Sequence, residues 1–217
     1  MAHHIDLSHD ITAGMITYPG LPEPLIADHM SREAAEKIYG PGMTFQIGLV
    51  TMCTNTGTYI DVPFHRYADG HDLTGLALDA VAAVDAVCVD QVGVMEIDLA
   101  DVDLGDAAGR AVLINTGHSR HWGTDAYFVD HPFLTEDAAH RLVAAEVACV
   151  GVDSLNIDST STGARPVHTM LLGSDIPIIE HLTNLDQIPV AAFRFTAVPP
   201  KIEGCGTFTV RAYATVD

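Results

Sequence analysis

The sequence predicts an α/β fold in a single domain, with a mixed sheet that helices cover on at least one face. Short apolar stretches rich in β-branched residues recur along the chain and outnumber the helical patterns. Only part of the chain alternates strictly between strand and helix, which favours a mixed sheet over a purely parallel one. The length of 217 residues suits one large domain, so we expect a single domain over residues 1–217.

The first half of the chain is predicted to contain a loop followed by strands. Residues 16–24 (ITYPGLPEP) are rich in proline and should form a loop. Residues 43–53 (MTFQIGLVTMC) have the composition of a buried strand. A further strand, residues 56–62 (TGTYIDV), ends at Pro63. Two more strand candidates are residues 83–92 (AVDAVCVDQV) and 110–117 (RAVLINTG).

The second half is predicted to alternate between helices and strands. Residues 135–145 form a helix with Thr135 as its cap, acidic residues in its first turn and one apolar face. Residues 147–157 follow as a strand that is buried on both sides, and residues 168–175 form a short helix that ends near Gly173. The remaining strand candidates are residues 176–182, 190–198 and 206–216.

The charge and the cysteine pattern limit the class of protein. The formal net charge is −19, which disfavours phosphate backbones and anionic lipid, so we expect neither nucleic acid nor membrane as a partner. The start of the chain lacks a secretory signal, and no apolar stretch reaches transmembrane length. Four cysteines without a CxxC pair (Cys53, Cys88, Cys149 and Cys205) indicate reduced thiols. We therefore expect a cytoplasmic protein.

Two polar clusters carry the candidate chemistry. In the first, residues 55–65 (NTGTYIDVPFH), Asp61 and His65 lie four residues apart on a segment broken by proline. By itself, this cluster is also compatible with a carboxylate that caps a turn and a half-exposed histidine. In the second, Glu180 follows the apolar residues IPII and lies twelve residues after His168. A carboxylate at that position requires a cation or several donors if it stays buried, unless it reaches solvent at the end of the strand.

Together the two clusters supply the parts of a metal-assisted hydrolase. Asp61, His168 and Glu180 form an N/O ligand set that suits zinc, manganese or non-haem iron. A metal held there would acidify a water molecule, and His65 would remain as a general acid and base near neutral pH.

The segment from Asn55 to His65 resembles the motif HxGTHxDxPxH of the cyclase family, whose best-known members are bacterial kynurenine formamidases (arylformamidases). The resemblance continues through the opening IDLSHDITAGMITYPG, the later VGVDSLNID and HTMLLGSDIPIIEHLTNL, and the tail PPKIEGCGTFTVRA. It implies the family's α/β swivelling (β/β/α) domain, in which a small barrel-like sheet packs with helices. It also implies a homodimer or homotetramer.

The resemblance assigns a role to individual residues. Asp61 corresponds to the aspartate that the family shares between two metals, and His168 and Glu180 correspond to its later pair of ligands. His65 corresponds to the catalytic histidine. Tyr18 takes the place of an aromatic residue that contacts substrate before Pro-Gly in the opening loop.

The sequence departs from the motif at two positions. Asn55 and Tyr59 replace the first and second motif histidines, and neither is a good zinc ligand. We therefore expect one divalent metal, zinc or manganese, or none, with Asn55 and Tyr59 lining the substrate pocket. His118 and His121 could supply a substitute ligand, although two solvated loop histidines are the more ordinary interpretation.

The resulting prediction is a metal-dependent hydrolase of a small amide, lactam or lactone, with a small-molecule substrate and His65 as general acid and base. Two alternatives stay open from the sequence. One is a metal-free cyclase, lyase or isomerase that uses Asp61 and His65. The other is a binding protein that has kept the pocket without catalysis.

Overall fold

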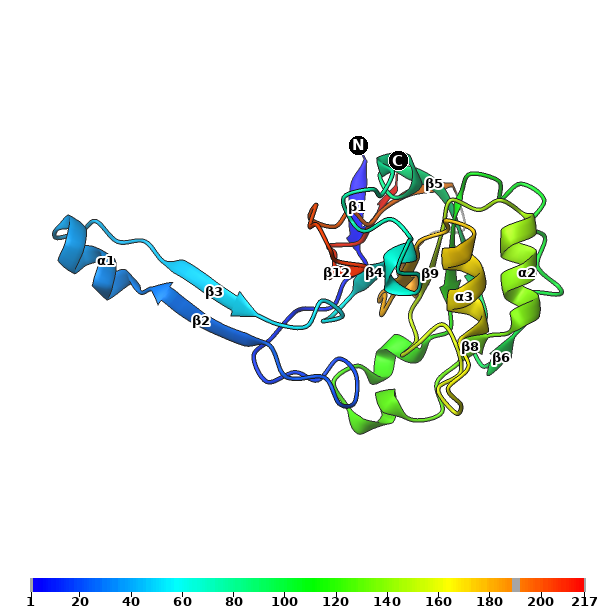
Figure 1. The fold of residues 1–217 in the computed structure, drawn as a ribbon, viewed down its shortest axis with the longest axis horizontal. Coiled ribbons are helices and arrows are strands. Elements are labelled where there is room, and N and C mark those ends of the chain that lie inside the picture. Colours follow the sequence, from blue (N-terminus) through cyan, green and yellow to red (C-terminus); the bar gives the residue numbers. More distant parts are fainter. Residues whose placement is uncertain (1, 189–191, 217) are drawn as a thin grey trace.

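The centre of the sheet is formed by four parallel strands: β5 (Val84–Asp90), β7 (Ala111–Asn115), β9 (Cys149–Val152) and β10 (Ile178–Glu180). The computed structural model describes residues 2–188 and 192–216 (Figure 1). Every residue of β7, β9 and β10 is buried, as expected for parallel strands that are covered on both faces. Their apolar runs made these strands predictable from the sequence.

Antiparallel strands extend the sheet at both edges. On one side lie β4 (Tyr59–Asp61) and β12 (Thr207–Thr209). On the other lie β11 (Phe193–Thr196), β13 (Tyr213–Val216) and β1 (His3–Asp6). The order is β1-β13-β11-β5-β7-β9-β10-β4-β12, a nine-stranded mixed sheet. The prediction of a mixed α/β fold is confirmed.

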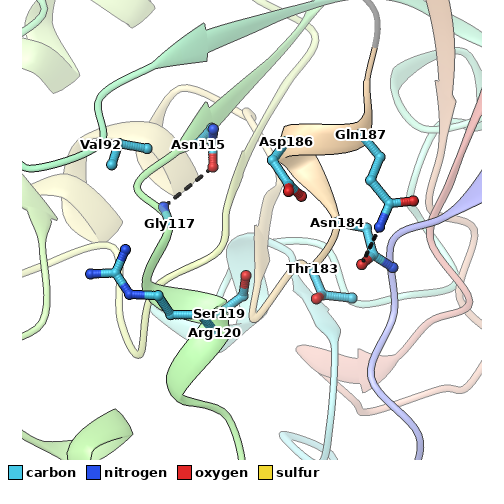
Figure 2. Close-up of a pocket in the computed structure, with 9 residues that line it drawn as sticks. All are labelled: Val92, Asn115, Gly117, Ser119, Arg120, Thr183, Asn184, Asp186 and Gln187. Carbon is cyan, nitrogen blue, oxygen red and sulfur yellow. Dashed lines mark hydrogen bonds between the residues drawn. The ribbon is translucent and has the colours of Figure 1, made fainter.

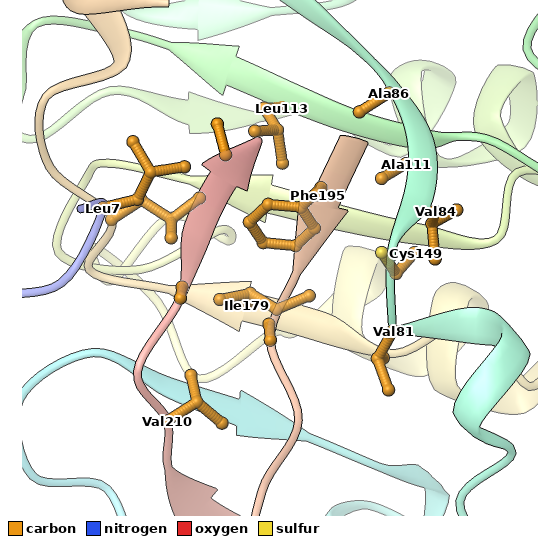
Figure 3. Packing of buried hydrophobic residues seen from close by; sticks show 14 of the residues in the cluster. Leu7, Val81, Val84, Ala86, Ala111, Leu113, Cys149, Ile179, Phe195 and Val210 are labelled. Carbon is orange, nitrogen blue, oxygen red and sulfur yellow. The ribbon is translucent and has the colours of Figure 1, made fainter. Parts of the chain in front are cut away.

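The sheet separates two apolar cores. Side chains alternate along β7, so Val112 and Ile114 face one core while Ala111 and Leu113 face the other. The first core packs under α2 (Glu136–Ala144) and α3 (Pro166–Gly173). Figure 3 shows the second core, in which side chains of the central strands, such as Leu113 and Ile179, pack with Phe195 of β11. Helices therefore cover one face of the sheet, as predicted.

The predicted cap holds and most boundaries shift by one to three residues, but the strand predicted over residues 147–157 is shorter, because β9 ends at Val152. The Thr135 hydroxyl accepts a hydrogen bond from the Ala138 N–H at 3.2 Å and begins α2. Helix α3 begins at Pro166, two residues before the predicted range. The stretch 206–216 is two strands rather than one, because its two parts pair with β4 and β11. Strand β11 begins at Phe193, and residues 190–191 of the predicted range lie outside the described residues.

One expectation about the first half is wrong. The apolar stretch 43–53 does contain β3 (Ile47–Thr51), but every residue of β3 is exposed. It pairs with β2 (Leu25–Met30) in a two-stranded sheet that, with α1 (Arg32–Tyr39), forms an arm reaching away from the rest of the molecule (Figure 1). The stretch was expected to be buried because apolar composition does not reveal whether a strand joins the main sheet.

The other elements are short. Residues 16–24 form a loop without helix or strand, as predicted. The strands β6 (Glu96–Ile97) and β8 (Phe133–Leu134) form a small parallel pair. Single 3₁₀ turns complete the fold: η1 (Pro63–His65), η2 (Leu78–Ala80), η3 (His118–His121), η4 (Asp125–Phe128) and η5 (Leu185–Gln187). Among the helices of the described residues, none combines the length and the apolar character that a membrane crossing requires.

Candidate active site

Strand β4 carries Asp61 into the interior between β10 and β12. Its backbone lies opposite Ile178 on one side and Thr207 on the other. The Asp61 side chain is completely buried, and neither carboxylate oxygen has a hydrogen-bond partner among the described residues. An ionised carboxylate without partners is expensive to bury, so its surroundings must supply positive charge.

His168 faces this carboxylate from the first turns of α3. Its Nε2 lies 3.5 Å from Oδ2 of Asp61, while its Nδ1 lies 2.6 Å from Oδ2 of Asp158. The Asp158 carboxylate also accepts the backbone N–H groups of Val167 and His168, at 2.8 and 3.0 Å. Asp158 therefore caps the helix and fixes the imidazole with Nε2 directed at Asp61.

Asp158 is a site residue that the sequence interpretation missed. A signal was present, because an aspartate that directly follows the predicted strand 147–157 and lies ten residues before a candidate histidine ligand is a suitable orienting carboxylate. Burial lowers the pKa of His168, but Asp158, Asp61 and Glu180 outweigh it and raise the pKa to about 10. The carboxylates thus favour a positive charge at this position, carried by a proton or by a metal cation.

Glu180 and Tyr59 form a buried cross-strand pair. They lie directly opposite each other on β10 and β4, and the Tyr59 hydroxyl donates a hydrogen bond to Oε2 of Glu180. The other oxygen, Oε1, accepts the Ile157 N–H at 2.6 Å and lies 3.8 Å from Nε2 of His168. Burial raises the pKa of Glu180 to about 7. Burial, and then the charge of Glu180, raises the pKa of Tyr59 well above its ordinary value, so the phenol stays neutral and acts as a donor.

His65 completes the cluster from the outer side. It ends η1, is exposed, and its ring centroid lies 5.9 Å from that of His168. Asp61, His65 and His168 each offer one ligand atom, and these atoms all lie within 4.8 Å of one another. The structure therefore brings together all four residues on which the sequence prediction depended, with His65 as the accessible member.

Two of the residues predicted to line the pocket, Asn55 and Tyr18, lie outside the cluster of Asp61, His65, His168 and Glu180. The Asn55 side-chain oxygen accepts hydrogen bonds from the Thr54 and Thr207 hydroxyls at 3.2 and 3.1 Å, beside the strand that carries Tyr59. Tyr18 is half-buried in the opening loop. The contact that ties this loop to the motif is made by its neighbour Thr17, whose hydroxyl accepts the Gly57 N–H at 2.9 Å.

Of His118 and His121, only His118 differs from the ordinary interpretation of two solvated histidines, because His121 remains partly exposed. His118 is buried, and its Nε2 lies 2.9 Å from the Tyr127 carbonyl oxygen. Nε2 of His121 accepts a hydrogen bond from Arg120 at 3.1 Å. Among the described residues, neither belongs to the group of side chains placed to share a metal ion. Both lie on η3, which turns His118 inward under Tyr127.

A second buried cluster adjoins the site through His181, the residue after Glu180. His181 is fully buried at a φ of +57°, a conformation that non-glycine residues rarely adopt. Its Nδ1 lies 2.9 Å from the Tyr127 hydroxyl, and its ring centroid lies 5.2 Å from that of Tyr59. Trp122 packs on the edge of His181 and stacks on His9 at 4.0 Å, so the opening loop is fixed against the wall of the site.

The polar hollow in Figure 2 is separate from this arrangement. It measures about 390 Å³ and lies beyond the carboxyl ends of β5 and β7. Its lining includes Asn115, Arg120 and Asp186 but none of Asp61, His65, His168 or Glu180. The candidate chemistry therefore lies at the β4–β10 edge of the sheet.

Solved structures with the same fold include enzymes. The chain matches a structure described as a potential metal-dependent hydrolase with cyclase activity, at a TM-score of 0.79 and 25% identity, covering 99% of this chain and 98% of that one. The fold is also that of isatin hydrolase A from Ralstonia solanacearum, at a TM-score of 0.80 and 23% identity, covering 100% of this chain and 92% of that one. Fold and site together define a hydrolytic enzyme.

The family follows from the sequence comparisons. Residues 5–159 match the Cyclase family model, and the chain belongs to that family. It is 27% identical over 213 residues to a kynurenine formamidase from Salinibacter ruber, covering 96% of this chain and 95% of that protein. A kynurenine formamidase from Bacillus cytotoxicus is 26% identical, with the same coverage. The resemblance inferred from the motif NTGTYIDVPFH is confirmed at the level of the family.

Proposed function

We propose that this enzyme hydrolyses a small amide, lactam or lactone, with one divalent cation at Asp61 and His168 and with His65 moving the proton. The observation that carries the proposal is the Asp61 carboxylate, which is completely buried and has no hydrogen-bond partner among the described residues. His168 is directed at it by Asp158, and His65 faces both from the accessible side.

The donor set fits a zinc or manganese ion. Asp61 contributes carboxylate oxygens that have no hydrogen-bond partner in the described chain, and His168 contributes an Nε2 whose ring is held in place. Glu180 is the third ligand in this proposal, because Oε1 accepts one hydrogen bond and retains a further lone pair. When bound, such a cation supplies Lewis acidity to a carbonyl group and lowers the pKa of water.

The side chains of the protein perform the proton transfers. His65 takes a proton from the attacking water as the new C–O bond forms at the carbonyl carbon. It then returns that proton to the leaving nitrogen or oxygen as the bond to the carbonyl carbon breaks. Its exposed position on η1 suits a group that must exchange protons with a substrate and with solvent. Tyr59 and Asn55 form a polar wall of neutral groups beside the cluster.

The relatives support in particular the amides and lactams of this class, in which the bond cleaved is a C–N bond that is not a peptide bond. The names of the matched proteins are kynurenine formamidase and isatin hydrolase. Because Asn55 and Tyr59 replace two histidines of the family motif, the substrate of this chain need not be either of theirs. The proposal therefore stays at the class of small amides, lactams and lactones.

Elemental analysis combined with a substrate panel tests the proposal. We expect one zinc or manganese per chain after dialysis, and turnover of at least one member of a panel of formamides, lactams including isatin, and lactones. His168→Ala should lose the metal and the turnover. His65→Ala should keep the metal and lose the turnover, which distinguishes an acid–base role from a ligand role.

The same measurements can contradict the proposal. Two metals per chain would show that the replaced motif histidines are not needed for a second site. Turnover that survives removal of the metal would favour a metal-free lyase or isomerase. Substrate binding by a metal-free protein without turnover would favour a binding protein.

A further inference from the structure

The two segments that carry His65 and His168 reverse the charge of the rest of the chain. Residues 62–68 and 159–174 contain two arginines and no aspartate or glutamate, although the whole chain has 29 acidic residues against 10 basic ones. The acidic residues that follow the two segments, Asp69 and Asp175, line another hollow, at the end of α3, where Asp175 lies 2.6 Å from His71. The accessible side of the site is therefore locally positive.

One of the two arginines, Arg165, is used within the protein. Its Nη1 donates hydrogen bonds to the carbonyl oxygens of the loop that precedes α3, at distances of 2.7 to 3.1 Å: those of Ser159, Thr162 and Ala164. Its side chain is also partly buried. Arg165 thus fixes the loop before α3 and is a poor candidate for holding a ligand.

The other arginine, Arg66, is held in place with part of its guanidinium unused. It is exposed and directly follows His65. Its Nε donates a hydrogen bond to Oγ1 of Thr169, the residue after His168, at 3.2 Å, and its Cζ lies 5.7 Å from the centroid of the Tyr67 ring. Among the described residues Nη1 and Nη2 have no hydrogen-bond partner, and the side chain forms no ion pair. Two parallel N–H donors on an oriented guanidinium match the geometry of a carboxylate.

We propose that Arg66 binds a carboxylate group of the substrate, so that the enzyme acts on anionic amides, lactams or lactones. The inference rests on the proposed hydrolysis and adds the charge of the substrate to it. The carboxylate is a separate group from the bond that is cleaved. His65 serves that bond, and the next residue along the chain, Arg66, holds the anion on the solvent side.

The net charge of the chain makes a dedicated donor necessary. A molecule with a formal charge of −19 repels anions over most of its surface, so an anionic substrate is selected only where positive charge is concentrated. Arg66 supplies that charge beside the catalytic histidine. A neutral substrate gains nothing from it, and the arginine therefore separates substrates by their charge.

Binding of a matched pair of formanilides tests the proposal without turnover. The pair is para-formamidobenzoate and para-formamidobenzamide, which share the ring and the formamide and differ in the charge of one substituent. Each compound is titrated calorimetrically into zinc-loaded His65→Ala enzyme, which should bind both without hydrolysing them. We expect the carboxylate to bind about 10- to 100-fold more tightly than the neutral compound, because Arg66 forms charge-assisted hydrogen bonds with it alone.

Three variants in the same background assign this preference to a residue. Arg66→Gln should abolish it. Arg66→Lys should keep only part of it, because an ammonium group lacks the planar pair of donors. The matched control is Arg120→Gln, which removes the same charge from another exposed arginine, at the separate hollow of Figure 2, and should keep the whole preference.

Equal affinities for the two compounds, failure of the carboxylate to bind, or a preference that survives Arg66→Gln would overturn the proposal. The last result would show that the metal or another group holds the carboxylate. A preference that depends on Arg66, in an enzyme whose unaltered form hydrolyses no member of the substrate panel, would support the carboxylate site and contradict the proposed hydrolysis. The two proposals therefore fail on different measurements.

Discussion

At the scale of single residues, the phenol of Tyr59 changes the charge balance of the site. The family motif has a histidine at this position, which can bear a positive charge or bind a metal. Tyr59 instead donates a hydrogen bond to Glu180 and is kept neutral by burial. The cluster therefore keeps its three carboxylates, Asp61, Asp158 and Glu180, around the single imidazole of His168. The proposal of one cation rather than two depends on this loss of a histidine ligand.

The orienting role of Asp158 gives a prediction at this scale. Asp158→Asn can still accept backbone hydrogen bonds at the start of α3, but it no longer supplies a charged acceptor to Nδ1 of His168. We expect zinc affinity, measured by calorimetric titration, to fall about 10- to 100-fold. The control is Asp153→Asn, because Asp153 is equally buried but accepts from Thr116 and Gly117. Equal zinc affinity in Asp158→Asn and in the unaltered enzyme would contradict an orienting role.

At the scale of elements, the site depends on how closely β12 approaches η1. Both elements adjoin β4, which pairs with β12 and leads through Val62 and Pro63 into η1. The Val62 N–H donates to the Gly206 carbonyl at 2.9 Å, just before β12 begins. A Cβ atom on Gly206 would lie 2.7 Å from Cα of His65. The absence of a side chain at Gly206 thus sets the position of His65.

Gly206→Ala tests this packing. The added methyl group meets backbone rather than a flexible side chain, so η1 must move. We expect a loss of about 1–3 kcal/mol in the free energy of unfolding. We also expect a lower turnover number, because His65 is displaced. Gly163→Ala is the control, since nothing lies within 4 Å of its Cβ position, and it should change stability by less than about 0.5 kcal/mol. A Gly206→Ala enzyme with unchanged stability and activity would refute the close approach.

At the scale of the whole molecule, the buried His181 and the half-buried His9 couple folding to pH. Burial lowers the pKa of His181 to about 3 and that of His9 to about 4, against an ordinary value of 6.5. In the unfolded chain both residues bind a proton as the pH falls below 6.5, whereas in the folded protein they stay neutral. Each therefore stabilises the fold above that pH, and this contribution is lost as the pH falls towards the folded-state pKa values.

The prediction is a measurable acid sensitivity. Between about pH 6.5 and pH 4, each of these histidines should lower the free energy of unfolding by about 1.4 kcal/mol per pH unit. His181→Asn tolerates the positive φ and should reduce this slope in urea unfolding experiments, even if it lowers stability at neutral pH. The control is His140→Asn, on the exposed side of α2. An unchanged slope in His181→Asn would show that His181 is protonated in the folded protein.

The sequence by itself determined the central strands, the cap at Thr135, the family and the candidate site residues that the structure brings together. These properties depend on local information. Apolar runs such as β7 and β9 specify buried parallel strands, and Asp61, His65, His168 and Glu180 have chemistries that can be recognised without coordinates.

Only the tertiary structure decided the environment of those residues. The pairing of Tyr59 with Glu180 depends on the register between strands 121 positions apart, and the approach of His168 to Asp61 depends on contacts between segments that are far apart in the sequence. The exposure of β3 depends on its separation from the main sheet, although its composition is that of a buried strand. Register, burial and long-range contacts arise from the whole chain, and no local pattern of residues encodes them.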